Sequence, residues 1–361
     1  ELSTLNNRSV IAINGVRARL RVLLISGQPH AGERTWRNLL KSDPSVDLVH
    51  FTILRPPEKD DMTPLRELAL IVFPIQELFE VKLKDFNLIV FDRYMVRGVL
   101  PPSYLRNIEN YVREGGALML AVGPEFAGLR SLFQTPLGAI MPGTPTGEVL
   151  EQGFRPAITD VGSRHPVTAT LVADPLAKPR WGRWFRQIEA GNEDGDTLMD
   201  GIGKRPLLIV NRVEKGRVAQ LMSDHIWLWA RQFEGGGPQG EILRRLAHWL
   251  MKEPELEEES LAARADGGQL TIERHSLTVE VPPVTVTTPS GATENVILKA
   301  ERGGRAQATI AAPETGLYRV ADGTRTALAA VGALNAPELM DLRATDERLG
   351  PTVAATGGGV A

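Results

Sequence analysis

The chain has 361 residues, which suggests two or three domains, and its 42% hydrophobic and 24% charged residues are ordinary for a globular protein. Lysine and arginine number 41 against 44 aspartates and glutamates, a net charge of −3. We predict no nucleic-acid partner, because nucleic-acid binders usually carry a basic field. The absence of cysteine excludes disulfides and cysteine-ligated metal sites. No apolar run approaches the roughly 20 residues that cross a bilayer, so no transmembrane segment is expected.

The first half of the chain alternates strands and helices. Residues 1–18 hold one expected strand, Ser9–Ile13, which would end a preceding β-domain or add an edge strand to the domain after it. Beyond it, strands are predicted at Arg21–Ser26, Asp47–Ile53, Leu88–Asp92 and Ala117–Val122, with helices at Ala31–Lys41, Leu65–Phe86 and Pro102–Arg113. Continuous apolar strands separated by amphipathic helices predict an α/β domain with a parallel sheet covered on both faces.

The second half predicts the end of this domain and a change of architecture. Strands are expected at Leu207–Arg212 and Gly216–Met222 and a helix at Gln239–Lys252, which closes a domain of residues 19–255. The acidic run Glu253–Glu259 and the pair Gly267-Gly268 predict a linker at 256–268. Short strands then follow with period two, at Gln269–Thr271, Ser276–Val281, Val284–Thr287, Asn295–Ala300, Ala306–Ala311 and Gly316–Ala321. They predict a small antiparallel β-sandwich at 269–335, followed by a tail at 336–361.

The segment Tyr111–Gly128 resembles the nucleophile elbow of class I glutamine amidotransferases. A helix is expected to end at Gly115-Gly116, and an apolar strand and a sharp turn come after it. The enzymes place a G-x-C-x-G turn here and use the cysteine thiolate as nucleophile. This chain has Glu125 in the middle position and Ala127 in place of the closing glycine. Because a carboxylate cannot replace the thiolate in glutamine hydrolysis, we predict no glutaminase activity.

A wider resemblance covers most of residues 19–254. It rests on VLLISGQPHAGERTWRNLLKSDPSVDLVHFTILRPPEKDD (Val22–Asp61), LIVFDRY (Leu88–Tyr94), RHPVTA (Arg164–Ala169) and GRVAQLMSDHIWLWARQFEGGGPQGEILRRLAHWLMKEPE (Gly216–Glu255). These stretches resemble the cysteine-less glutamine amidotransferase-like domain of large bacterial membrane proteins that have an aerotolerance-type N-terminus and von Willebrand A-like and Ig-like modules.

The resemblance implies a flavodoxin-like domain on the extracytoplasmic, periplasmic face of the inner membrane, followed by an Ig-like β-sandwich. It also implies that other domains of the same membrane protein are partners, and it brings no established biochemical role. The chain starts at Glu1 without methionine and ends in a glycine-rich stretch, so we expect a piece of a longer protein.

Candidate site residues lie just after the apolar strands. Because right-handed crossovers bring the carboxyl ends of parallel strands to one edge, ligands of such sheets bind there. We expect His30, Asp92, Glu125 and His225 to surround one solvent-accessible crevice at that edge. The predicted ligand-binding residues are Gln28, His30, Glu33, Arg34, Asp92, Arg93, Glu125 and Phe126, and the catalytic candidates are Glu125, Asp224 and His225.

Each catalytic candidate also has a structural interpretation, and we favour it. His225 beside Asp224 suits a base or a metal ligand, but Asp224 could instead cap the next turn while His225 packs beneath Trp227 and Trp229. Glu125 suits a general base, but it could instead accept hydrogen bonds from turn amides or pair with Arg93.

A metal site is the weaker prediction for the same residues. His30, Glu33, Asp92 and His225 would suit a divalent metal if they met. No compact ligand spacing such as HExxH occurs, so we predict neither a metal nor a cofactor.

Two functions remain open from the sequence. The first is a non-catalytic platform that binds a protein partner or a small ligand at the strand ends. The second is a cysteine-independent hydrolase or metal-assisted enzyme that uses Glu125, His225 and Asp92. An enzyme requires Glu125, His30 and His225 to lie within hydrogen-bond reach or one water of each other.

Overall fold

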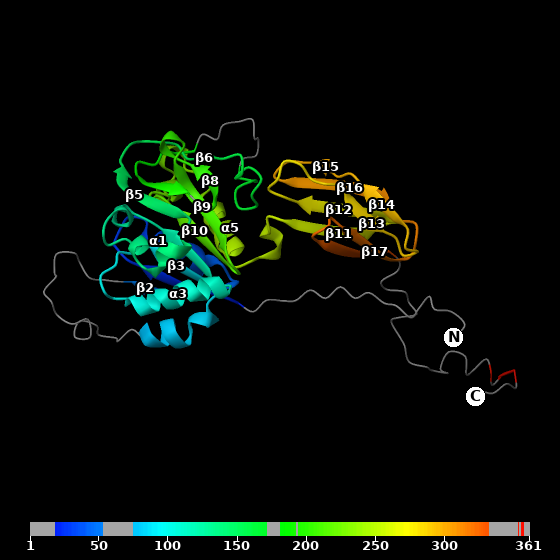
Figure 1. The fold of residues 1–361 in the computed structure, drawn as a ribbon, viewed down its shortest axis with the longest axis horizontal. Coiled ribbons are helices and arrows are strands. Elements are labelled where there is room, and N and C mark those ends of the chain that lie inside the picture. The colour runs from blue at the N-terminus through cyan, green and yellow to red at the C-terminus, as the bar shows by residue number, and fades with distance from the viewer. Residues whose placement is uncertain are drawn as a thin grey trace.

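The computed structural model describes residues 19–52, 75–171, 181–192 and 194–331, together with residues 353, 355 and 356. The strand expected at Ser9–Ile13, residues 65–74 of the helix expected at Leu65–Phe86, and most of the expected tail lie outside the described residues. Figure 1 shows an α/β domain with a β-sandwich beside it. No helix in these ranges combines the length and the apolar character that crossing a membrane requires.

An eight-stranded sheet with the order β2-β1-β3-β4-β10-β9-β8-β6 forms the centre of the α/β domain. The strands are β1 (Leu20–Ser26), β2 (Val46–Thr52), β3 (Leu88–Asp92), β4 (Ala117–Ala121), β6 (Ala157–Ile158), β8 (Asp196–Asp200), β9 (Pro206–Val213) and β10 (Gly216–Leu221). The five strands from β2 to β10 in this order are parallel, so the sheet is mostly parallel.

The last three strands of the sheet are antiparallel, which the sequence prediction missed. β9 and β10 form a hairpin that pairs Val213 with Gly216, and Glu214 in the turn has a φ of 52°. So short a connection cannot contain a crossover, and the two strands must therefore run in opposite directions. β8 and β6 continue the antiparallel part to the far edge of the sheet.

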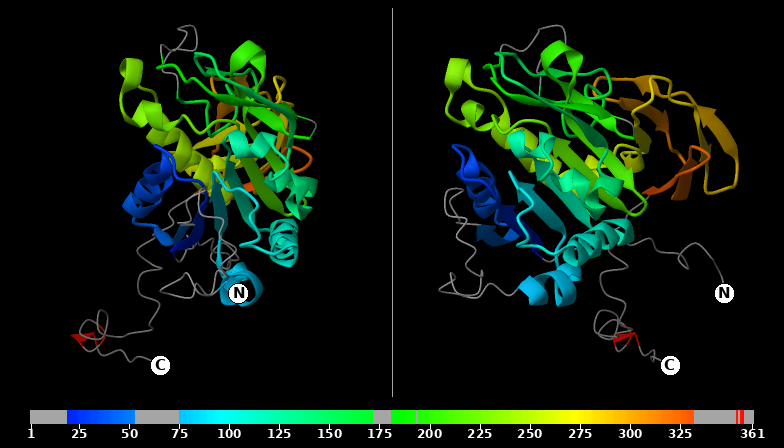
Figure 2. Two further views of the ribbon diagram at one scale, coloured as in Figure 1. Left: turned by 90° about the vertical axis from the view of Figure 1, so that its left-hand side faces the viewer. Right: turned by 60° about the vertical axis from the view of Figure 1, so that its left-hand side comes forward.

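Helices cover both faces of the sheet (Figure 2). The helices are α1 (Glu33–Ser42), α3 (Pro102–Glu114), α4 (Trp227–Ala230) and α5 (Gln239–Leu250), with short turns at η1 (Glu77–Val81), η2 (Leu83–Asp85) and η3 (Pro124–Ala127). One core joins Trp36 of α1 and Leu246 of α5 to one face of β1, and the other joins Phe79 of η1 and Ile108 of α3 to the opposite face. A separate pair, β5 (Gly143–Leu150) and β7 (Gln187–Asn192), lies outside the large sheet.

The β-sandwich consists of two four-stranded sheets with the orders β11-β12-β16-β15 and β14-β13-β17-β18. Its strands are β11 (Ser260–Asp266), β12 (Gln269–His275), β13 (Val284–Thr287), β14 (Thr293–Val296), β15 (Lys299–Ala300), β16 (Arg305–Ala311), β17 (Gly316–Ala321) and β18 (Thr326–Val331). Alternate apolar side chains, such as those of Leu270 and Ile272, meet Val284 and Tyr318 in a core between the sheets.

The linker predicted at 256–268 is wrong over most of its length. Residues Ser260–Asp266 form β11, which pairs with β12 through a turn at Gly267-Gly268. Both glycines have positive φ values, 54° and 76°, a conformation that costs glycine little. The strand expected at Ser276–Val281 is also wrong, because this stretch belongs to no strand.

The acidic run before β11 joins the two domains instead of facing solvent. Glu257 pairs with Arg217 and, at 2.7 Å, with Arg212, both in the α/β domain. Glu258 contacts Arg212 and lies 3.6 Å from the Nε2 of His165, while Glu259 pairs with Arg274 of the sandwich. We call this set, Glu257–Glu259 with its partners, the interdomain joint.

Candidate functional site

The carboxyl ends of β1 and β3 mark the point where the strand order of the sheet reverses. α1 leads from β1 to β2 on one face, whereas η1 and η2 precede β3 on the other face. Ligands of open α/β sheets bind in the crevice at such a point. Here the backbone closes it: the N–H of Gly27 donates to Asp92 O and that of Gln28 to Arg93 O, both at 2.8 Å. A Cβ on Gly27 would lie 2.2 Å from Arg93 O, so this approach requires glycine.

His30 and Asp92 form a pair across this reversal point. The Nε2 of His30 lies 3.0 Å from Asp92 Oδ2, and the two side chains are 7% and 2% exposed. The Nδ1 of His30 accepts the N–H of Gly32, so Nε2 carries the proton that is donated to Asp92. Burial raises the pKa of Asp92 above its usual value, although the hydrogen bond from His30 opposes the shift.

Glu125 occupies the turn after β4, and both parts of its structural interpretation occur. Its Oε1 accepts the N–H of Gly123 at 3.1 Å, and its Oε2 accepts Nη2 of Arg93 at 3.0 Å. The side chain is only 5% exposed. The turn thus has its own carboxylate held by a backbone amide and a guanidinium.

Arg93 connects the ends of three strands. It comes directly after β3 with a φ of 48°, a conformation that is uncommon outside glycine and is found at functional sites. Its Nη1 binds Asp224 Oδ2 at 3.1 Å, and Arg186 binds the same oxygen at 3.1 Å. Burial works against its charge, but Glu125 and Asp224 together raise the pKa of Arg93. We call Arg93, Glu125, Asp224 and Arg186 the strand-end network.

His225 lies at the rim of this network. Its Nδ1 accepts the N–H of Phe185 at 3.2 Å, and its Nε2 lies 3.8 Å from Asp224 Oδ1. The ring meets Trp227 edge to face, with centroids 6.4 Å apart. Burial lowers the pKa of His225, and although Asp224 opposes the shift, the charge of Arg186 adds to it.

The cap assigned to Asp224 in the structural interpretation is wrong. The Oγ of Ser223, not a carboxylate oxygen of Asp224, accepts the N–H of His225 at 3.1 Å. Asp224 is instead fully used in ion pairs with two arginines. The ring partner of Trp229 is instead Trp184, tilted by 54° with centroids 4.8 Å apart, and that of His225 is Trp227.

The structure brings the predicted strand-end residues to one edge but does not leave them open. The side chains of His30, Asp92 and Glu125 are 7%, 2% and 5% exposed, and that of His225 is 17% exposed. The expectation that they surround a solvent-accessible crevice is therefore wrong. The reason is that Arg93 and the backbone of Gly27 and Gln28 fill the space between the strand ends.

The remaining ligand-binding candidates are placed differently. Glu33 begins α1 and is partly buried, and Arg34 is exposed on the first turn. Phe126 is 3% exposed and packs edge to face on Phe133, so its ring belongs to the core. The short helix η3 turns its ring into the core.

Sequence reasoning missed two participants at this edge. Arg186 lies in an irregular stretch just before β7, and only tertiary packing brings it to Asp224. Ser26 at the end of β1 lies 2.9 Å, Oγ to Nε2, from His50 of β2. Burial lowers the pKa of His50, and Arg37 adds to the shift. β1 and β2 are parallel with Leu24 opposite His50, and this register brings His50 within reach of Ser26, two residues further along β1.

A metal centre has no support in this geometry. Within the part of the chain that the structure describes, no group of three or more histidine, aspartate or glutamate side chains is arranged to hold an ion. Of the four residues considered for it, His30 and Asp92 form a pair, the His225 ring is held by the N–H of Phe185, and Glu33 begins α1.

The described residues define a mixed α/β domain with a mostly parallel sheet and, after it, two packed β-sheets. No protein-family profile and no curated protein sequence matches the chain. Solved structures resemble part of the fold. A cytoplasmic protein of Salmonella typhimurium is 19% identical over 64% of this chain and 99% of its own, with a TM-score of 0.46. A second, from strain LT2, is 17% identical over the same shares, with a TM-score of 0.47.

A third structural relative is a ThuA-like protein of Bacteroides uniformis. It is 13% identical over 67% of this chain and 95% of its own, with a TM-score of 0.42. All three similarities concern the arrangement of the backbone alone.

Proposed function

We propose that residues 19–255 form a flavodoxin-like, class I glutamine amidotransferase-like domain that has lost catalysis and serves as a binding platform. In this proposal the domain belongs to a bacterial membrane protein and lies on the periplasmic face of the inner membrane. Its partners are other domains of the same protein, a further protein or a small ligand. The sequence stretches that resemble such proteins support this context, and a mostly parallel sheet with helices on both faces is compatible with it.

The observation that carries the proposal is the state of Glu125. In an amidotransferase the nucleophile stands free at this turn, and nearby N–H groups receive the oxyanion of the intermediate. Here the residue is a carboxylate, and it already accepts the N–H of Gly123 and the guanidinium of Arg93. The turn therefore lacks the nucleophile, and its Gly123 N–H is already used.

The acid–base candidates are held in the same way. His225 has one nitrogen bonded to the Phe185 N–H and the other directed to Asp224. Asp224 is shared between two arginines, Arg93 and Arg186, each at 3.1 Å. A base that has no nucleophile beside it performs no covalent chemistry.

The hydrolase alternative has one observation in its favour. Burial raises the pKa of Asp92, and a carboxyl with a raised pKa beside a histidine is a common catalytic feature. However, His30 and Asp92 are 7% and 2% exposed, so a substrate has no access to them without a rearrangement of the Gly27–Gln28 backbone. This favours the binding platform.

The exposed part of the network defines the binding surface. Arg186 is 26% exposed and His225 17%, and Glu151 at the rim pairs with Arg186 at 3.2 Å. A ligand carboxylate can compete with Glu151 for the exposed guanidinium of Arg186. Such exchange leaves the buried pairs of Arg93 intact.

Two assays test this function. Ammonia release from glutamine should equal the buffer background, for the native chain and for Glu125→Ala alike; release that the substitution abolishes would overturn the proposal. In histidine-resolved NMR spectra, succinate or a neighbouring domain of the same protein should shift His225 but leave His248 unchanged. A His225 that stays silent with both probes would rule out this surface as the binding site.

The proposed periplasmic location can be tested by labelling an introduced cysteine. Leu129 is 95% exposed, so Leu129→Cys supplies these 361 residues with one reactive thiol, and the larger membrane protein without the substitution is the labelling control. A membrane-impermeant maleimide should label this thiol in cells whose outer membrane is permeabilised. Labelling only after lysis would contradict the location.

A further inference from the structure

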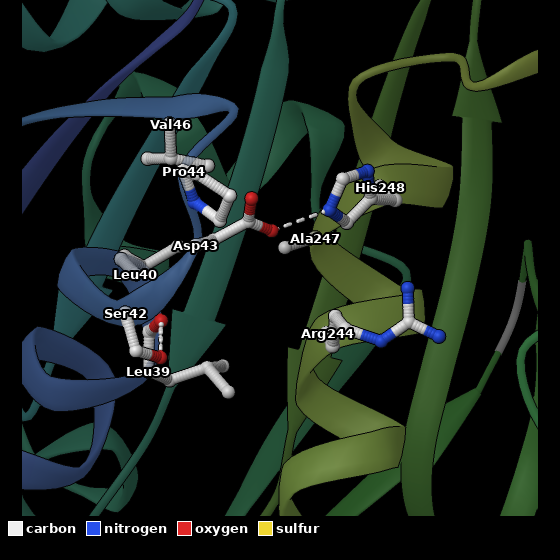
Figure 3. A pocket seen from close by; sticks show the side chains of 9 residues that line it. All are labelled: Leu39, Leu40, Ser42, Asp43, Pro44, Val46, Arg244, Ala247 and His248. Atoms are coloured by element: carbon white, nitrogen blue, oxygen red, sulfur yellow. Dashed lines mark hydrogen bonds and ion pairs between the residues drawn. The ribbon is translucent and has the colours of Figure 1, made fainter.

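A second potential site lies on the side of the molecule opposite the strand ends. A cavity of about 340 Å³ opens between the end of α1, the start of β2 and the middle of α5 (Figure 3). Its apolar wall consists of Leu39, Leu40, Pro44, Val46 and Ala247. The volume falls in the range of small-molecule sites, roughly 300–1,000 Å³, which are mostly apolar with a few fixed polar groups.

The fixed polar group of this cavity is an ion pair that spans the two helices. The Nε2 of His248 donates to Asp43 Oδ2 at 2.8 Å, and Ser45 donates its N–H and its hydroxyl to Asp43 Oδ1. Partial burial opposes ionisation, but the hydrogen bonds from Ser45 and His248 hold the pKa of Asp43 below its usual value. The carboxylate therefore stays charged at neutral pH.

The other polar groups at the cavity are mainly acceptors or are already occupied. Ser42 donates its hydroxyl proton to Leu39 O at 2.8 Å, which leaves its lone pairs free to accept. Glu253, outside the cavity lining, lies 3.9 Å from the Nδ1 of His248 and adds a second carboxylate nearby. The guanidinium of Arg244 pairs with Glu241 at 3.2 Å, and Figure 3 shows it directed away from Asp43.

An apolar wall with a charged carboxylate and few free donors selects one ligand chemistry. We propose that this cavity binds a small organic cation, an amine with a compact alkyl or aromatic body. The ammonium group donates to Asp43 and Ser42, and the body packs against Leu39, Val46 and Ala247. A carboxylate of the same shape is repelled by Asp43 and Glu253. This site does not depend on the strand-end network, which lies at the carboxyl edge of the sheet.

Benzylamine, benzyl alcohol and benzoate form a matched set of probes, because they share a ring and differ in the charge of the head group. In amide NMR titrations of the full chain, benzylamine should give saturable shifts at Leu39, Val46 and Ala247. Benzyl alcohol should bind more weakly and benzoate should not bind. No saturable benzylamine shift up to about 10 mM, or equal binding of benzoate, would overturn the proposal.

Two substitutions separate the contribution of the Asp43 charge to benzylamine binding from that of the cavity space. Asp43→Asn should raise the Kd of benzylamine about tenfold, since it removes the charged acceptor. Ala247→Leu should weaken both benzylamine and benzyl alcohol because it fills the cavity. Asp47→Asn is the matched control, since Asp47 is a half-exposed carboxylate on β2 outside the cavity lining, and it should leave Kd unchanged.

If Asp43→Asn binds benzylamine as tightly as the native chain, the charge argument fails. Thermal melts of each variant show whether it is folded. Ala247→Leu keeps the Asp43–His248 pair, so it tests the location of the site even if Asp43→Asn unfolds. Benzylamine binding unaffected by Ala247→Leu would place the site elsewhere.

Discussion

Buried ion pairs occur in two regions of this molecule, the strand-end network and the interdomain joint, and the two are built differently. The network collects single residues from the ends of separate strands, so that Arg93, Glu125 and Asp224 meet at one edge. The joint uses three consecutive glutamates in an extended segment. Glu257 and Glu258 reach back to the α/β domain, whereas Glu259 reaches forward to the sandwich.

The two regions also differ in how deeply their most buried cation lies. Arg217 in the joint is 2% exposed, donates to the backbone O of Trp249 and lies 4.8 Å from the centroid of that ring. In the network, Arg93 is 15% and Arg186 26% exposed. A charge that water cannot reach depends wholly on its partners, while a partly exposed one can exchange a partner for a ligand. The joint therefore suits structural support, and the network suits binding.

The largest expected effect is the loss of unfolding free energy when the buried Arg217 of the interdomain joint is replaced, compared with the loss of an arginine from a surface ion pair. Arg217→Met should destabilise the protein by about 3 kcal/mol, because it removes a buried partner of Glu257 and one of the two donors to the Trp249 carbonyl, which keeps the N–H of Lys252. Urea unfolding followed by tryptophan fluorescence measures the loss. Arg244→Met is the control: Arg244 is 49% exposed and its partner Glu241 is 39% exposed, so its loss should cost about 1 kcal/mol or less. Equal losses for the two variants would show that burial of Arg217 is not what stabilises the joint.

A smaller loss of unfolding free energy is expected when the strand-end network is disrupted. Asp224→Asn should cost about 2 kcal/mol, since Arg93 keeps Glu125 and the partly exposed Arg186 keeps Glu151 and water. The same urea assay gives the value, and Ser223→Ala reports the cost of losing the neighbouring hydroxyl, which accepts the His225 N–H and donates to the Arg186 carbonyl. A loss from Asp224→Asn that exceeds the loss from Arg217→Met would reverse the assignment of structural and binding roles.

Much of the α/β domain was predictable because its strands are continuous apolar runs. Leu88–Asp92 was predicted with the bounds that β3 has, and the helix at Pro102–Arg113 differs from α3 by one residue. The direction of β9, antiparallel to β10, was missed because a buried apolar strand looks the same in either orientation. Only the short connection around Glu214 carried that information.

The topology of the sheet brings the strand-end residues to one edge, but it does not determine whether their side chains are buried there. Parallel crossovers bring Asp92, Glu125 and Asp224 to one edge whatever the side chains are. Whether the edge is open depends on Arg93, whose positive φ and two carboxylate partners cannot be read from the local sequence. The roles assigned to these residues remain predictions.

The acidic run was misread for a related reason. A series of glutamates next to a proline usually lies in solvent, and nothing within several residues of Glu257 or Glu258 is basic except Lys252. Their partners Arg212 and Arg217 lie about 40 positions earlier in the chain. Ion pairs between residues so far apart leave no pattern in the local sequence. The β-strand that follows, Ser260–Asp266, differs in that its residues alternate in burial.

The smallest expected effect concerns pH and compares one histidine from each region. His165 of the joint is fully buried, its Nδ1 accepts the Val167 N–H, and its ring meets Trp249 edge to face. Burial lowers the pKa of His165, although Glu258 opposes the shift. The folded state therefore resists protonation, and the unfolded chain binds the proton first as pH falls below about 6.5. Stability present above that pH should decline as pH falls toward the lowered value.

His165→Asn should remove part of this decline, because asparagine can accept the Val167 N–H but does not titrate. Urea unfolding between pH 7.5 and pH 5 measures it, and one proton contributes at most about 1.4 kcal/mol per pH unit. His225→Asn in the network is the matched variant, and its effect should be smaller because the ring is 17% exposed. His275, whose two nitrogens face the carbonyls of Glu258 and Gly303, is present in both variants, so its contribution cancels. If His225→Asn changes the slope of unfolding free energy against pH more than His165→Asn does, then the strand-end network, not the joint, holds the histidine whose burial costs more.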